Sequence, residues 1–167
     1  MLFRSWAVTL GTSRSADKLE RCVAMGLDVA IDTGRGELVK AVKAAAPDGV
    51  DLILDLVGAA YLTANIRSLR VGGSLICIGL LGGASAEFPL GLVLSRRLRV
   101  QGTVLRSRPL EEKIGLAQRF SREVIPLFER GALAPVIDQV FPVEAVVEAH
   151  AMMESNQTFG KLVLAWS

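Results

Sequence analysis

Residues 49–58 read GVDLILDLVG, and this stretch decides the fold because its centre, 52–54, is continuously apolar and glycines bound it. A strand with one solvent-exposed face alternates apolar and polar residues, whereas a strand buried on both faces, as in parallel α/β sheets, does not have to alternate. A second apolar run, GSLICIG over 73–79, follows a helical segment over 59–69. Strand, helix and strand at this spacing predict a βαβ unit with parallel strands.

The rest of the chain continues the alternation of strands and helices. Further strands are predicted over 6–10, 29–31, 98–105, 136–141 and 161–166, and further helices over 15–25, 37–46, 89–96, 110–130 and 143–154. The period-two pattern of 98–105 predicts an edge strand, and Pro126 inside the long helix predicts a kink. These elements predict the α/β class.

Composition excludes several function classes. The 167 residues are 51% hydrophobic and 22% charged, with a net charge of +2, which is too small to indicate nucleic-acid binding. No apolar run approaches the roughly 20 residues of a membrane-spanning helix. Cys22 and Cys77 are the only cysteines and lack metal-ligand spacing, so a reduced, cytoplasmic setting is expected.

The turn after the first predicted strand is the first candidate site. It contains Ser13, Arg14 and Ser15, with Lys18 one turn further on. In dinucleotide-binding sheets an acid at such a strand end binds the ribose of NAD, and a base accommodates the 2′-phosphate of NADP. Hydroxyls with Arg and Lys suit a phosphate. The alternative is a solvated turn in which Ser15 caps the next helix.

A second candidate is the glycine-rich turn after the strand at 73–79, which includes Gly79, Leu80 and Leu81. Ligands of open α/β sheets bind at the carboxyl ends of strands, and glycines let backbone approach them closely. A flexible loop with no ligand is equally compatible. Asp55, at the end of the preceding strand, is expected to be a buried carboxylate bonded to backbone. His150 has no catalytic partner at a suitable spacing and is expected to be structural.

These segments together resemble the medium-chain dehydrogenase/reductase superfamily. Residues 25–28 (MGLD) resemble its "LGAD" stretch, 50–58 resemble "GVDVVLDxVG", and 72–79 resemble "GGRLVxIG". The end of the chain, 148–164, resembles the closing "EAHxxmExxxxxGKiVL". Segments 105–108 and 124–128 resemble the branch of zinc-free, NADPH-using quinone oxidoreductases.

The resemblance implies a Rossmann-like, doubly wound parallel sheet that lacks its first strand, followed by a C-terminal β-α-β return segment. Residues 6–131 would be a partial dinucleotide-binding domain and 132–167 the C-terminal segment of the catalytic domain. Independently of the resemblance, residues 1–5 do not fit the strand that follows them and are expected to be a non-native start. The family's glycine-rich turn is not found upstream of Trp6. We therefore expect this chain alone to be inactive and marginally folded.

The resemblance also implies a function, namely hydride transfer from NADP(H) to a small quinone or enone. Alternatives are a zinc-type alcohol dehydrogenase, whose metal ligands would lie elsewhere, and an inactive dimerising fragment. A homodimer would form through the edge strand at 98–104. No catalytic residue is implied, and the implied cofactor-binding residues are Ser13, Arg14, Ser15, Lys18, Gly79, Leu80, Leu81, Val104, Leu105, Arg106 and Lys161.

Overall fold

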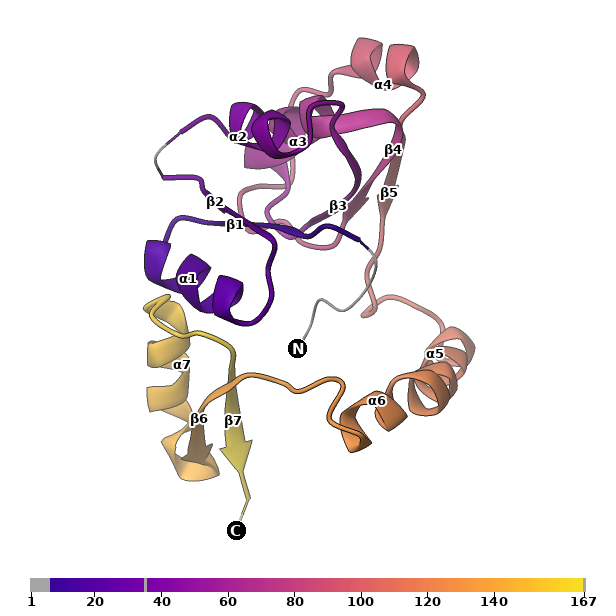
Figure 1. Cartoon of the computed structure of the whole chain (residues 1–167). Coiled ribbons are helices and arrows are strands. Elements are labelled where there is room, and N and C mark those ends of the chain that lie inside the picture. The colour runs from indigo at the N-terminus through magenta and orange to yellow at the C-terminus, as the bar shows by residue number, and fades with distance from the viewer. Residues whose placement is uncertain (1–6, 35, 167) are drawn as a thin grey trace. The chain divides into compact units, whose positions relative to one another are not determined.

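The structure, a computed structural model, describes residues 7–34 and 36–166, so the expected non-native start at 1–5 lies outside the described residues. Residues 7–117 and 118–166 form two compact units. Each unit is a mixture of helices and parallel strands, which confirms the α/β class (Figure 1). The expected domain boundary between 131 and 132 stays a prediction.

Two parallel sheets build the first unit. Strand β1 (Leu10–Ser13) pairs with β2 (Val29–Asp32). The second sheet has the order β3-β4-β5, formed by β3 (Val50–Asp55), β4 (Leu69–Cys77) and β5 (Arg99–Gly102). The predicted parallel pairing of the two apolar runs is confirmed, and so is the edge position of the strand after residue 98.

Strand β1 begins later in the chain than expected, so the prediction of a strand over 6–10 is wrong for residues 7–9 and holds only at Leu10. Thr9 is instead held by Asp28, whose Oδ2 accepts bonds from the Thr9 amide at 2.8 Å and the Thr9 hydroxyl at 2.7 Å. Pairing with β2 continues through Ser13. The predicted strand over 98–105 is likewise shortened, because its pairing with β4 ends at Gly102.

Helices of the first unit follow the predicted order, and Ser15 caps the first of them as expected. They are α1 (Ala16–Ala24), α2 (Leu38–Ala45), a short 3₁₀ turn η1 (Ala59–Tyr61) that leads into α3 (Leu62–Ser68), and α4 (Leu90–Arg96). The main core lies where α3 meets β4 and the start of β5. Its buried members are Ile66, Leu69, Leu75 and Leu98, the first three of which are fully buried.

No strand joins the two sheets of this unit within the described residues. β1 pairs only with β2, and β3 pairs only with β4, so each has an unpaired edge. Alternate leucines of the β3 segment are more than half exposed, namely Leu52 at 53%, Leu54 at 59% and Leu56 at 56%. The apolar run of β3, whose sequence predicts burial on both faces, is therefore covered on only one face.

The second unit contains the expected return segment. β6 (Ile137–Pro142) leads through η2 (Val143–Ala145) and α7 (Val146–Glu154) to β7 (Lys161–Ala165), and the two strands pair in parallel. The long helix predicted over 110–130 is divided into α5 (Leu110–Glu123) and α6 (Ile125–Glu129). Pro126 is the second residue of α6, so the predicted kink is a break between two helices. None of the described helices is long and apolar enough to cross a membrane.

Candidate functional site

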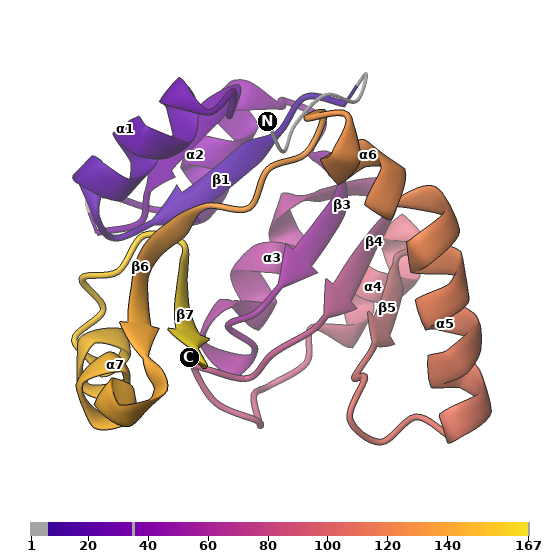
Figure 2. The same cartoon turned by 90° about the horizontal axis from the view of Figure 1, so that it is seen from below.

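Most of the predicted site residues lie at the carboxyl ends of the parallel strands. Arg14 follows directly on the last residue of β1, Gly79 lies two residues after β4, and Val104 lies two residues after β5. In Figure 2 the arrows of β1, β3, β4 and β5 all point toward the lower side of the first unit. These residues therefore lie along one side of that unit, where open α/β sheets bind ligands.

The turn between β1 and α1 is tightly ordered. The Ser13 hydroxyl oxygen accepts a bond from the Ser15 amide at 3.1 Å, and the Ser15 hydroxyl oxygen accepts one from the Lys18 amide at 3.3 Å. A hydroxyl that accepts one bond keeps its own hydrogen for donation. Arg14 is exposed and Lys18 is half-buried. Two hydroxyl donors and two cations thus lie within six residues at the end of β1.

Sequence reasoning missed one residue at this position, Asp32. The register of the β1–β2 pair places it directly beside Ser13. Its Oδ1 accepts a bond from the Gly34 amide at 2.8 Å, and a Cβ added to Gly34 would lie 3.8 Å from the Arg14 carbonyl oxygen. Parallel pairing brings the carboxyl ends of neighbouring strands together, so the predicted strand over 29–31 could have indicated that the residue after it lies at this site. A second carboxylate, Asp17, lies in the first turn of α1.

Asp55 is the buried, backbone-bonded carboxylate that its position at the strand end predicts. It is 3% exposed, and its Oδ1 accepts bonds from the amides of Val57 at 2.7 Å and Gly58 at 3.0 Å. Its Oδ2 is buried and has no hydrogen-bond partner among the described residues. Asp55 lies beside Cys77 in the β3–β4 register, and burial, followed by this carboxylate charge, raises the pKa of the Cys77 thiol.

The glycine-rich turn after β4 is more ordered than the predicted flexible loop. The Asp55 carbonyl accepts bonds from the amides of Ile78 and Gly79, and the next three bonds tie Leu81 to Leu56, Gly82 to Val57 and Ala59 to Gly83. A Cβ on Gly79 would lie 2.7 Å from the Leu56 carbonyl oxygen. Glycine is therefore needed for this close backbone contact. The side chains of Leu80 and Leu81 remain exposed, at 58% and 88%.

The loop after β5 carries three more predicted residues, Val104, Leu105 and Arg106, and all three are exposed. Arg108 braces this loop, because it donates to the Thr103 hydroxyl at 3.0 Å and to Glu112 at 3.2 Å. The Arg106 carbonyl accepts a bond from the Lys113 ammonium at 2.9 Å. The loop therefore has a defined backbone while the side chain of Arg106 projects from an exposed position.

Lys161 begins β7 in the second unit, so its predicted place beside the other residues stays a prediction. His150 lies on an exposed position of α7, and among the described residues its side chain makes no hydrogen bond. Nor do the described residues contain a group of three or more His, Cys, Asp or Glu side chains that could hold a metal ion. The described residues therefore do not fit a zinc site.

Comparison with known proteins gives the family. The model of the zinc-binding dehydrogenase family matches residues 25–164, which is most of the chain. Quinone oxidoreductase-like protein 2 of Bos taurus is 25% identical over 160 residues, which are 95% of this chain and 46% of that protein.

Two solved structures share the fold. The Escherichia coli quinone oxidoreductase complexed with NADPH has a TM-score of 0.78 and 24% identity, over 93% of this chain and 48% of that one. An NAD-dependent alcohol dehydrogenase has a TM-score of 0.72 and 30% identity, over 93% and 43%. The chain therefore spans about half the length of the relatives that it matches.

Proposed function

Because this chain belongs to the zinc-binding dehydrogenase family, in the quinone oxidoreductase-like branch of the medium-chain dehydrogenases and reductases, we propose that it is the nucleotide-binding part of an NADP(H)-dependent oxidoreductase. The observation that carries the proposal is the ordered β1–α1 turn, which places two hydroxyls and two cations at the end of a parallel strand. A phosphate prefers such donors.

Each part of the site has a distinct task. Ser13, Arg14, Ser15 and Lys18 bind the 2′-phosphate. The bonded turn at 79–81 and the loop at 104–106 line the nicotinamide side, and their backbone order limits the positions that a substrate can take. A bound nicotinamide supplies the hydride, and the acceptor is a small quinone or enone. The residues of this chain bind the dinucleotide and orient it toward the acceptor.

A second candidate is an NAD-dependent alcohol dehydrogenase. The observation that favours it is Asp32, which lies beside Ser13 and brings a carboxylate to the strand end where NAD enzymes bind a ribose hydroxyl. The two proposals differ in one measurable property, the preference between the phosphorylated and the plain dinucleotide.

Isothermal titration of the chain with NADPH and with NADH tests the proposal. We expect NADPH to bind more tightly, and we expect Arg14→Gln to weaken NADPH binding about tenfold, as loss of one charge-assisted bond does, while NADH binding is unchanged. Arg21→Gln is the matched control, because it removes the same charge from the last turn of α1. Equal affinity for the two nucleotides, or preference for NADH, would support the second candidate.

The Asp32→Asn variant separates the candidates further. If the site binds a 2′-phosphate, removal of the neighbouring negative charge strengthens NADPH binding and leaves NADH binding unchanged. If Asp32 instead binds a ribose hydroxyl, the variant weakens NADH binding. The two results exclude each other.

The assembly and the setting complete the proposal. The free edge of β5 pairs with its twofold copy, so the protein is a homodimer. The compartment is the reducing cytoplasm, which agrees with the unpaired state of Cys22 and Cys77. We propose neither nucleic acid nor a membrane as a partner.

A further inference from the structure

A groove of about 670 Å³ lies among three helices of the first unit. Each helix contributes one cation to its lining, and none of the lining residues is acidic. The cations are Lys43 from α2, Arg67 from α3 and Arg96 from α4, and the apolar part of the lining includes Val39, Pro89 and Leu92. The volume falls within the roughly 300–1,000 Å³ of small-molecule sites.

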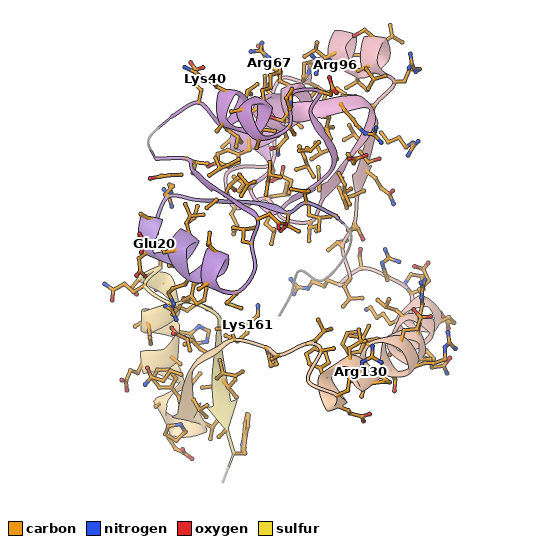
Figure 3. All side chains as sticks on the ribbon, viewed as in Figure 1. Glu20, Lys40, Arg67, Arg96, Arg130 and Lys161 are labelled. Carbon is orange, nitrogen blue, oxygen red and sulfur yellow. The ribbon has the colours of Figure 1, made fainter. Side chains whose placement is uncertain are left out.

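The groove is separate from the nucleotide site. Each of the three cations lies in the last turn of its helix, and these helices lead into β3, β4 and β5. The cations therefore lie toward the amino ends of the parallel strands, whereas the predicted nucleotide residues follow their carboxyl ends. Figure 3 shows Arg67 and Arg96, with Lys40 of α2, along one outer edge of the unit.

One of the cations is held in place. Nη1 of Arg96 donates to the carbonyl oxygens of Arg67 at 3.1 Å and Leu69 at 3.2 Å, and the side chain is half-buried. The planar guanidinium is thereby fixed, and its other N–H groups make no hydrogen bond to the described residues. Lys43 and Arg67 have no ion-pair partner in the described part of the chain. Three cations thus share one groove without a carboxylate.

A helix explains one cation at its own end, because its last turn carries partial negative charge. Because the three helices lead into neighbouring parallel strands, their last turns lie on one side of the unit, and the three cations line one concave surface with apolar side chains between them. Like charges that share a groove repel each other, and a bound anion removes that repulsion. Arginine side chains bind phosphate and carboxylate oxygens in a fixed, bidentate geometry.

We propose that this groove binds a small organic phosphate. Its doubly charged head is bound by the guanidinium groups of Arg67 and Arg96 and the ammonium of Lys43. Its apolar body lies against the remaining lining, formed by Val39, Pro89 and Leu92. The site is independent of the dinucleotide and of the proposed reaction.

Phenyl phosphate is the probe that tests this proposal, in an NMR titration of the isotope-labelled full chain. We expect saturable shifts of backbone amides in α2, α3 and α4. Phenol and inorganic phosphate, which each supply half of the probe's chemistry, should bind at least about tenfold more weakly. Inorganic phosphate that binds as tightly as phenyl phosphate would overturn the assignment of an organic ligand, and the absence of saturable shifts would overturn the site.

Two variants and a control locate the binding. Lys43→Gln and Arg67→Gln should each weaken phenyl phosphate binding about tenfold, because each removes a charge-assisted bond. Lys40→Gln removes the same charge one turn away on α2 and outside the groove. The affinity of this variant for phenyl phosphate should therefore stay within about twofold of the wild-type affinity. All three positions are exposed, and the amide spectra report whether each variant keeps its fold. Equal affinities in all variants would contradict the proposal.

A second titration in the presence of saturating NADPH separates this site from the proposed function. We expect the phenyl phosphate shifts in α2, α3 and α4 to persist. Displacement by NADPH would assign the probe to the nucleotide site and overturn the inference. Failure of NADPH to bind would contradict the proposed function alone, because the groove shares no residue with it.

Discussion

At the scale of single residues, short carboxylates hold the ends of the strands. Asp28 fixes Thr9 before β1, and Asp55 fixes Val57 and Gly58 after β3. In each case a side-chain oxygen satisfies backbone amides that the adjoining strand leaves free. The positions of the candidate loops therefore depend on carboxylates that do not take part in chemistry.

Asp28 gives a prediction about pH. The Thr9 amide and then the Thr9 hydroxyl bond to its carboxylate and lower the pKa of Asp28. A lowered pKa in the folded state means a contribution to stability that is present above the ordinary value of about 3.9. That contribution is lost as the pH falls through the lowered value. Thermal unfolding should show Asp28→Asn less stable than the wild type at pH 7, with the difference shrinking at acid pH.

The control for this prediction is Asp48→Asn, which changes an exposed aspartate whose side chain makes no hydrogen bond within the described residues. Its effect on the unfolding temperature should be small at neutral pH. A difference for Asp28→Asn that persists unchanged well below the ordinary carboxylate pKa would contradict the role of the ionised form.

Asp55 gives a second prediction, through Cys77. Because burial and then the Asp55 charge raise the pKa of the Cys77 thiol, less of it is thiolate at neutral pH. Asp55→Asn removes the charge and keeps an oxygen that can accept from Val57 and Gly58. We expect faster alkylation of Cys77 by iodoacetamide in this variant, measured by mass spectrometry. Alkylation of Cys22 in the same sample is the internal control, and an unchanged ratio would refute the electrostatic link.

At the scale of elements, the sequence predicts the type and order of helices and strands better than their ends. The apolar runs predict β3 and β4, and Ser15 predicts the start of α1. The end of β1 is missed because Gly11 and Ser13 are typical turn residues in isolation, and only pairing with β2 makes them part of a strand. The place of Asp32 beside Ser13 is missed for the same reason, since register depends on tertiary contacts.

Strand β5 carries the prediction about assembly. The Thr103 amide donates to Cys77 of β4, so by the alternation of a strand the Gly102 amide faces the free edge. Gly102→Pro removes this donor, and a Cβ at position 102 meets nothing within 4 Å. We expect Gly102→Pro to be monomeric and Gly102→Ala, which keeps the amide, to remain dimeric by light scattering. Equal masses for the two variants would exclude this edge as the interface.

At the scale of the whole molecule, two parallel sheets in one unit leave the middle of that unit without a shared strand. The apolar run of β3 predicts cover on both faces, and the resemblance implies a doubly wound sheet that lacks its first strand. The described residues supply cover for one face only. An exposed leucine gains little from folding, so this face adds little to the stability of the chain, while the core between α3 and β4 carries most of it.

This unequal distribution gives the last prediction. Leu75 is fully buried, and Leu75→Ala should lower the free energy of unfolding by about 2–5 kcal/mol. Leu54 follows Ile53, which is the register partner of Leu75, and its side chain lies on the other face of the sheet. Leu54→Gln should change the free energy of unfolding by less than about 0.5 kcal/mol. Denaturant titration measures both values. A large loss for Leu54→Gln would mean that another surface covers the leucine row in solution, and the dependence of that loss on protein concentration would show whether the surface belongs to a second copy.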